Sequence, residues 1–169
     1  KKKPTKQNEV PANNDFDFYE AIRKQPLLGE IYLVAVTEGI DRNKVKHRYG
    51  QYGMDIVYQL LEHDLLRSVD KNTFTVSPNG PQFDHRVIYA LGKHFSERFF
   101  KMSDAPIGRN AIGFYVDSLN EDGYKKWLAV EQESYYKKLE IAKDKKNQGS
   151  IPVFTYGVTD TMIPERDKT

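Results

Sequence analysis

The clearest repeat of apolar and polar positions lies between Tyr52 and Leu66. Its apolar residues recur three and four positions apart, as on a helix with one buried face: Ile56, Val57, Leu60, Leu61 and Leu65. The next residues alternate, with Phe74 and Val76 between polar positions, and Asp70-Lys71-Asn72 is typical of a tight turn. The pattern predicts a helix that leads directly into a small β-hairpin, which is how a winged helix-turn-helix ends.

The residues before this helix predict further helices. We expect a short helix that is capped by Asn14 or Asp15 and ends near Lys24. Residues 30–38 are strongly apolar and are followed by Gly39, a natural left-handed end for a helix. Their β-branched content would also suit a strand. We favour a helix because the segment precedes a helix-turn-helix pattern.

A basic window follows, from Asp41 to Gly50, and predicts a short helix with a turn at the glycine. Its cationic side chains outnumber the single carboxylate of Asp41, and they are those of Arg42, Lys44, Lys46 and Arg48. The window and its neighbours thus predict three helices and a hairpin wing over residues 15–80.

Asn79-Gly80-Pro81 breaks the chain, and we place the boundary between two halves there. The second half predicts an amphipathic helix over residues 82–102 and a strand over 111–119, where apolar and polar positions alternate. A long helix from Asn120 to about Lys146 and a strand over 151–160 complete it. The predicted fold class is therefore α+β, with a winged helix-turn-helix followed by a helix-strand-long helix-strand half.

The predicted domains are a linker or tail (1–14), a winged-helix-like domain (15–80), an α+β domain (81–162) and a loose tail (163–169). The chain begins with Lys1 instead of Met, which suggests a fragment or a processed form. The formal net charge of +2 creates no strong global field, so any attraction to nucleic acid must be local. The chain has no cysteine and no apolar run as long as a membrane span, and we expect a cytoplasmic protein that does not enter a membrane.

The segment Leu60-Leu61-Glu62-His63-Asp64-Leu65-Leu66, followed by a hairpin, resembles the "L-x-x-L-G-L-L, acidic residue, wing" signature of bacterial winged-helix regulators. Asp64 stands where that signature usually has glycine. The order of elements from Tyr19 to Met162 is similar to that of a poorly characterised family of predicted bacterial transcriptional regulators with a C-terminal region of unknown function. The resemblance implies a regulatory role and carries over no catalytic residue and no ligand.

Duplex DNA and a protein are the two partners that such a surface could bind. The helix over residues 51–66 carries three carboxylates and no Lys or Arg, which makes it a poor major-groove binder. We therefore rank a protein partner above DNA and keep both. The candidate binding residues are the basic window with its histidine and the turn lysine: Arg42, Lys44, Lys46, His47, Arg48 and Lys71. A solvated helix face explains the basic window equally well.

Nothing in the sequence predicts catalysis, a metal site or a cofactor. His85 and His94 lie too far apart along one helix to share a metal, and no phosphate-binding loop is present. Trp127 and Tyr136 lie off the main apolar stripe of the long helix, and we consider them a candidate surface for a homodimer.

Three functions stay open at this stage. The first is a non-enzymatic regulatory module that resembles transcriptional regulators. The second is a scaffold or signalling adaptor that binds only protein. The third is a small-molecule sensor whose pocket would be lined by aromatic residues of the second half: Tyr115, Trp127, Tyr135, Tyr136, Phe154 and Tyr156.

Overall fold

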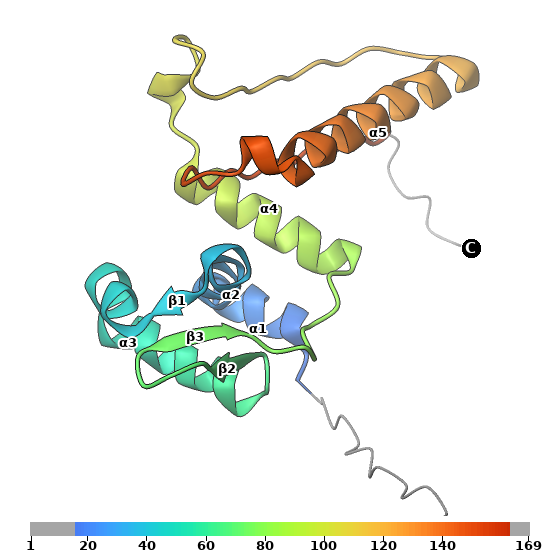
Figure 1. Ribbon diagram of the computed structural model, residues 1–169. Helices are drawn as coiled ribbons and strands as arrows, with labels where there is room; N and C mark the ends of the chain where they lie inside the picture. The colour runs from blue at the N-terminus through green and yellow to red at the C-terminus, as the bar shows by residue number, and fades with distance from the viewer. Residues whose placement is uncertain (1–15, 163–169) are drawn as a thin grey trace, which may run out of the picture. The chain divides into compact units, whose positions relative to one another are not determined.

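The computed structural model describes residues 16–162 and combines helices with a small antiparallel sheet, so it is an α+β structure (Figure 1). The chain divides into two compact units, Lys1–Arg98 and Phe99–Thr169. Each unit is described by itself below.

The first unit begins with two helices that meet at a proline. Helix α1 (Phe18–Lys24) is capped by Asp17, whose carboxylate accepts a hydrogen bond of 3.1 Å from the backbone N–H of Glu20. We had expected the cap at Asn14 or Asp15, which lie outside the described residues. Helix α2 (Pro26–Glu38) starts with proline, because the ring fixes a helical φ and no N–H is needed at that position. It ends at Gly39, as predicted, with a φ of 70°.

A strand of two residues, β1 (Ile40–Asp41), was missed by the sequence analysis. Helix α3 (Arg42–Glu62) follows at once, and the carboxylate of Asp41 caps it by accepting from the backbone N–H groups of Asn43 and Lys44. Gly50 has φ 68° and ψ −158°, which interrupts α3 with a kink. The predicted turn at Gly50 therefore separates two helical segments.

The end of α3 has the hydrogen bonds of a Schellman motif. The N–H of Leu65 donates to the carbonyl of Leu60 at 2.8 Å, and the N–H of Asp64 donates to that of Leu61 at 3.1 Å. Asp64 occupies the left-handed position, with a φ of 53°. Its carboxylate also accepts hydrogen bonds from Ser77 Oγ at 3.1 Å and from Asn79 Nδ2 at 2.9 Å. Asp64 thus joins the end of α3 to the segment that follows the sheet.

The hairpin consists of β2 (Leu66–Ser68) and β3 (Thr73–Val76), paired antiparallel with Ser68 opposite Phe74. Asp70 Oδ1 closes its turn by accepting from the N–H groups of Asn72 and Thr73. The strand order is β1-β3-β2, with Ile40 opposite Phe74. The hairpin was therefore predicted correctly. The expectation that the wing would have only two strands was wrong, because β1 adds a third strand.

The core of the first unit joins α1, α2, α3, the sheet and the start of helix α4 (His85–Phe99). Val87 and Leu91 of α4 are buried in it. Gly29 of α2 permits this contact, since a Cβ there would lie 2.4 Å from Leu91 Cδ2. The division between the units falls at Arg98–Phe99, whereas the sequence analysis placed it at Gly80–Pro81, because α4 packs on the first unit.

The second unit is organised around helix α5 (Glu121–Lys143), which Asn120 caps by accepting from the N–H of Gly123 at 2.8 Å. Short 3₁₀ turns cover Met102–Asp104 and Lys145–Asn147. Helix α5 therefore ends at Lys143, slightly before the end near Lys146 that the sequence predicted. Between Phe99 and Met162, no described side chain is buried.

The strands predicted over 111–119 and 151–160 are wrong, since neither segment has strand structure. Alternation places Ile112, Phe114 and Val116 on one side, but a strand also needs a neighbour to pair with its backbone. Here these three side chains are 65%, 93% and 50% exposed, so the predicted apolar face lies largely in solvent.

Candidate nucleic-acid or partner interface

The sequence-predicted binding residues lie on α3 and on the turn between β2 and β3. We call this region the α3–hairpin surface and define it by its exposed residues: Lys44, Lys46, His47, Gln51, Tyr52, Asp55, Tyr58, Glu62 and Lys71.

Arg42 serves the fold of this region. Its Nη1 donates to the hydroxyl of Tyr58 at 2.7 Å, and its Nε donates to the carbonyl of Lys71 at 3.3 Å. The guanidinium carbon also lies 5.4 Å from the centre of the Phe74 ring. Arg42 therefore holds the turn of the hairpin against α3, and its charge is directed toward the protein.

Arg48 is drawn toward a buried carboxylate. Its Nη2 lies 3.7 Å from Oε1 of Glu30, a residue of α2 with no exposed surface. Glu30 Oε1 also accepts a hydrogen bond of 2.8 Å from the hydroxyl of Tyr49, and Oε2 lies 3.1 Å from His94 Nε2 and 3.3 Å from Arg98 Nε. We call these five residues the Glu30 cluster.

The Glu30 cluster joins α2, the kinked region of α3 and the last turns of α4. The pKa of the Tyr49 hydroxyl is raised above its ordinary value, mainly because the group is buried and also because it donates a hydrogen bond to Glu30. A buried carboxylate is stable only with such partners. Glu30 itself has no exposed surface, whereas the side chains of Arg48 and Arg98 are about half exposed, so the cluster has the geometry of a structural support around a buried carboxylate. The sequence carries no local signal of this cluster, since Glu30 only marks the start of an apolar segment there.

Lys44, Lys46, His47 and Lys71 are exposed, as the binding prediction requires. Successive residues of a helix are about 100° apart, so Lys44 and His47 share one side of α3 while Lys46 points to another. The basic window therefore presents two lysines on different sides, and its two arginines contact the protein itself.

The second segment of α3 presents a different chemistry. Tyr52 and Tyr58 are 55% and 45% exposed, and Asp55 and Glu62 lie on the same exposed part of the helix. The Tyr52 hydroxyl accepts a hydrogen bond of 2.7 Å from Gln25 Nε2. Like the Arg42 contact with Tyr58, this bond fixes an aromatic ring at the surface. The segment is acidic and aromatic, with no Lys or Arg.

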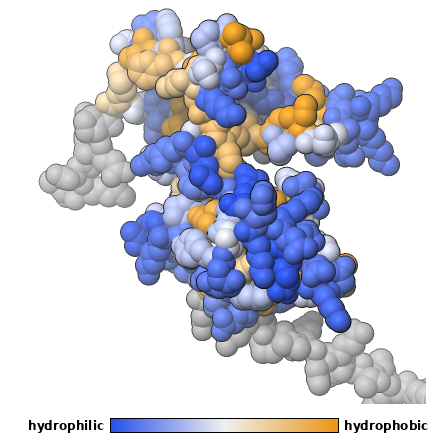
Figure 2. Space-filling view, turned by 90° about the vertical axis from the view of Figure 1, so that its left-hand side faces the viewer, coloured by the Kyte–Doolittle hydropathy of each residue, from blue (hydrophilic) through white to orange (hydrophobic). Residues whose placement is uncertain are grey.

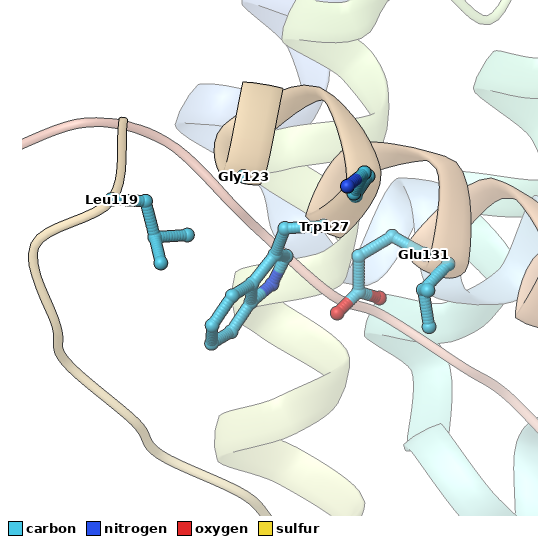
Figure 3. Close-up of a pocket in the computed structure, with 6 residues that line it drawn as sticks. Leu119, Gly123, Trp127 and Glu131 are labelled. Carbon is cyan, nitrogen blue, oxygen red and sulfur yellow. The ribbon is translucent and has the colours of Figure 1, made fainter. Parts of the chain in front are cut away.

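Trp127 and Tyr136, the candidate dimer residues, lie in the second unit on opposite sides of α5, because nine residues correspond to two and a half turns. The Trp127 ring stacks on the Tyr115 ring, with 5.4 Å between the two ring centroids. Trp127 also lines an open hollow of about 450 Å³, which Figure 3 shows at the start of α5. Of the six aromatic residues proposed to line a sensor pocket, Trp127 alone lines this hollow.

Within residues 16–162, no three His, Cys, Asp or Glu side chains come close enough together to hold a metal ion. In the same range, no helix combines the length and the hydropathy that crossing a membrane requires. Comparison of the chain with protein-family models, with curated proteins and with solved structures gave no significant match.

Proposed function

We propose that this chain is a non-enzymatic regulatory module of the winged-helix type that binds a protein partner through the α3–hairpin surface. The observation that carries the proposal is the second segment of α3, whose exposed side is acidic and aromatic. In a winged helix this segment is the one offered to the partner.

The order of elements supports the winged-helix part of the proposal. Helix α2, strand β1, the two segments of α3 and the β2–β3 hairpin follow one another in the chain and share one core (Figure 1). Asp64 is a second support. The resembled signature has glycine at this position, and Asp64 adopts the left-handed backbone that glycine favours, with a φ of 53°. The substitution thus keeps the backbone geometry of the signature.

Charge decides between protein and DNA. Binding to a duplex depends largely on cationic contacts to phosphate. Asp55 and Glu62 would repel the phosphates that line the major groove. Exposed tyrosines, by contrast, are enriched in protein interfaces because they bury much area while keeping a polar group. A partner with basic and apolar side chains fits this surface best.

Duplex DNA is the second candidate, and the exposure of Lys44, Lys46 and Lys71 favours it. These lysines can contact phosphates, which give affinity but not sequence choice. On this alternative the chain binds DNA weakly, without strong sequence preference and only at low salt.

The test uses fluorescence anisotropy of a random duplex and site-specific photocrosslinking in the native host. We expect weak, salt-sensitive DNA binding that Lys44→Glu with Lys46→Glu abolishes and that Asp55→Lys with Glu62→Lys strengthens.

A photoreactive residue at position 55 should crosslink one defined protein, and Glu62→Lys should remove that product. A photoreactive residue at exposed position 93 of α4 is the control. A selected DNA sequence bound tightly at physiological salt, or crosslinks at 55 no different from those at 93, would overturn the protein proposal.

A further inference from the structure

The second unit exposes an apolar side of α5. Two adjoining open hollows, which share Val130, run along this side. Their lining residues recur at helical spacing: Gly123, Trp127, Val130, Ser134, Lys138 and Ile141. Val130 and Ile141 are 63% and 61% exposed. Figure 3 shows Trp127 and Glu131 on this side of the helix, with Leu119 of the preceding segment beside them.

The burial pattern of the second unit favours a partner on this surface. No described residue between Phe99 and Met162 is buried, and Figure 2 shows exposed apolar side chains in orange on the second unit. A unit gains stability mainly from apolar area that it removes from water, and large apolar patches on a surface mark interaction sites.

We propose that the partner is a second copy of this chain, whose α5 packs antiparallel on the first with Ser134 at the two-fold axis. The charges of α5 carry this choice. Before Ser134 the helix has four carboxylates and two lysines, and after it three lysines and one carboxylate. An antiparallel pair therefore brings the acidic half of one helix against the basic half of the other. A parallel pair would bring like charges together.

The positions equidistant from Ser134 are complementary. Ile141 lies as many residues after Ser134 as Trp127 lies before it, so each Ile141 meets the Trp127 of the other copy. In the same way, each Glu131 meets a Lys137. Ser134 is small, which lets the two helix backbones approach at the axis, and one surface that complements itself closes a dimer. This inference does not depend on what the α3–hairpin surface binds.

Charge reversal in the unshortened chain of residues 1–169 tests the pairing. By sedimentation velocity over a wide concentration range, we expect the unaltered chain to form dimers. Glu131→Lys alone and Lys137→Glu alone should each weaken the dimer at least ~10-fold, and the double variant should restore it, since the pair then has its signs exchanged. Far-UV circular dichroism checks that α5 stays helical in each variant. A strict monomer, a complex with another protein only, or no rescue by the double variant would overturn the proposal.

Disulfide formation tests the register, and the chain suits it because it has no cysteine. Ser134→Cys should crosslink two copies at least ~10-fold faster than Lys125→Cys, which lies on the opposite side of α5, because the paired thiols have a high effective concentration. Ile141→Cys should not crosslink to itself, since the two positions are about 20 Å apart in the antiparallel pair. Rapid crosslinking of Ile141→Cys, or equal rates for Ser134→Cys and Lys125→Cys, would contradict the register.

Discussion

At the scale of single residues, the contacts of the buried carboxylate of Glu30 could not be predicted from the sequence. Its partners Tyr49, His94 and Arg98 lie 19, 64 and 68 residues away, so no local pattern connects them. Arg48 was predicted as a binding residue because its charge counted toward the basic window. In the structure that charge is directed at Glu30. Arg42 was also predicted as a binding residue, but its guanidinium contacts Tyr58 and Lys71. These partners are distant in sequence, so the contacts could not be predicted either.

The raised pKa of Tyr49 predicts a dependence of stability on alkaline pH. A group whose folded pKa lies above its unfolded pKa, about 10 for tyrosine, contributes stability that is complete below that pH and is lost as pH rises toward the folded value. Above pH ~10 the unfolded chain releases this proton while the folded chain retains it. Tyr49 alone therefore lowers the free energy of unfolding by up to about 1.4 kcal/mol per pH unit.

Tyr49→Phe removes this contribution. The variant should be less stable by about 1 kcal/mol at neutral pH, because the hydrogen bond to Glu30 is lost, and the difference should shrink above pH ~10. Urea unfolding of both proteins at several pH values measures it. Tyr136→Phe, at an exposed position of the second unit, is the matched control and should leave the pH profile unchanged. A Tyr49→Phe difference that stays constant with pH would contradict the argument.

At the scale of elements, local patterns predicted the helices and the hairpin, because each carries its own signal in cap, spacing and turn residues. Asp70, for example, closes the hairpin turn with its own carboxylate. Strand β1 escaped prediction since two residues cannot show a period. The opposite error occurred around Phe114, where alternation alone predicted a strand although residues 16–162 contain no strand that pairs with it.

Gly50 tests whether the kink of α3 is required. Its φ of 68° and ψ of −158° lie in a region that only glycine adopts readily, and a Cβ there would meet nothing within 4 Å. Gly50→Ala should therefore cost about 1–3 kcal/mol from backbone strain alone. Gly149→Ala is the control, because its Cβ also meets nothing and its φ lies outside the left-handed region. Urea unfolding compares the two, and equal stabilities would show that α3 straightens at no cost.

At the scale of the whole molecule, the two units differ in how they are stabilised. Every buried apolar side chain of the described residues lies between Phe18 and Leu91, within the first unit. The sequence suggested a boundary from turn residues at Gly80, but a boundary depends on where contacts end. Val87 and Leu91 carry the first core into α4, and their burial could not be inferred from α4 alone. Of the candidate binding residues, Lys44, Lys46, His47 and Lys71 are exposed, as expected. Trp127 and Tyr136 were expected to share one surface, but they face opposite sides of α5.

This difference predicts unfolding in two steps. Trp127 is the only tryptophan and lies in the second unit, so its fluorescence reports that unit alone. Amide hydrogen exchange of α3 reports the first unit. Because the second unit buries no described side chain, its fluorescence transition should occur at lower urea than the loss of protection in α3.

If α5 pairs with a second copy, raising the protein concentration should move only the fluorescence transition to higher urea, since dimerisation stabilises the unit that forms the interface. Coincident transitions that do not depend on concentration would show that the chain unfolds as one cooperative monomer, and they would contradict both the separate stability of the units and the pairing of α5.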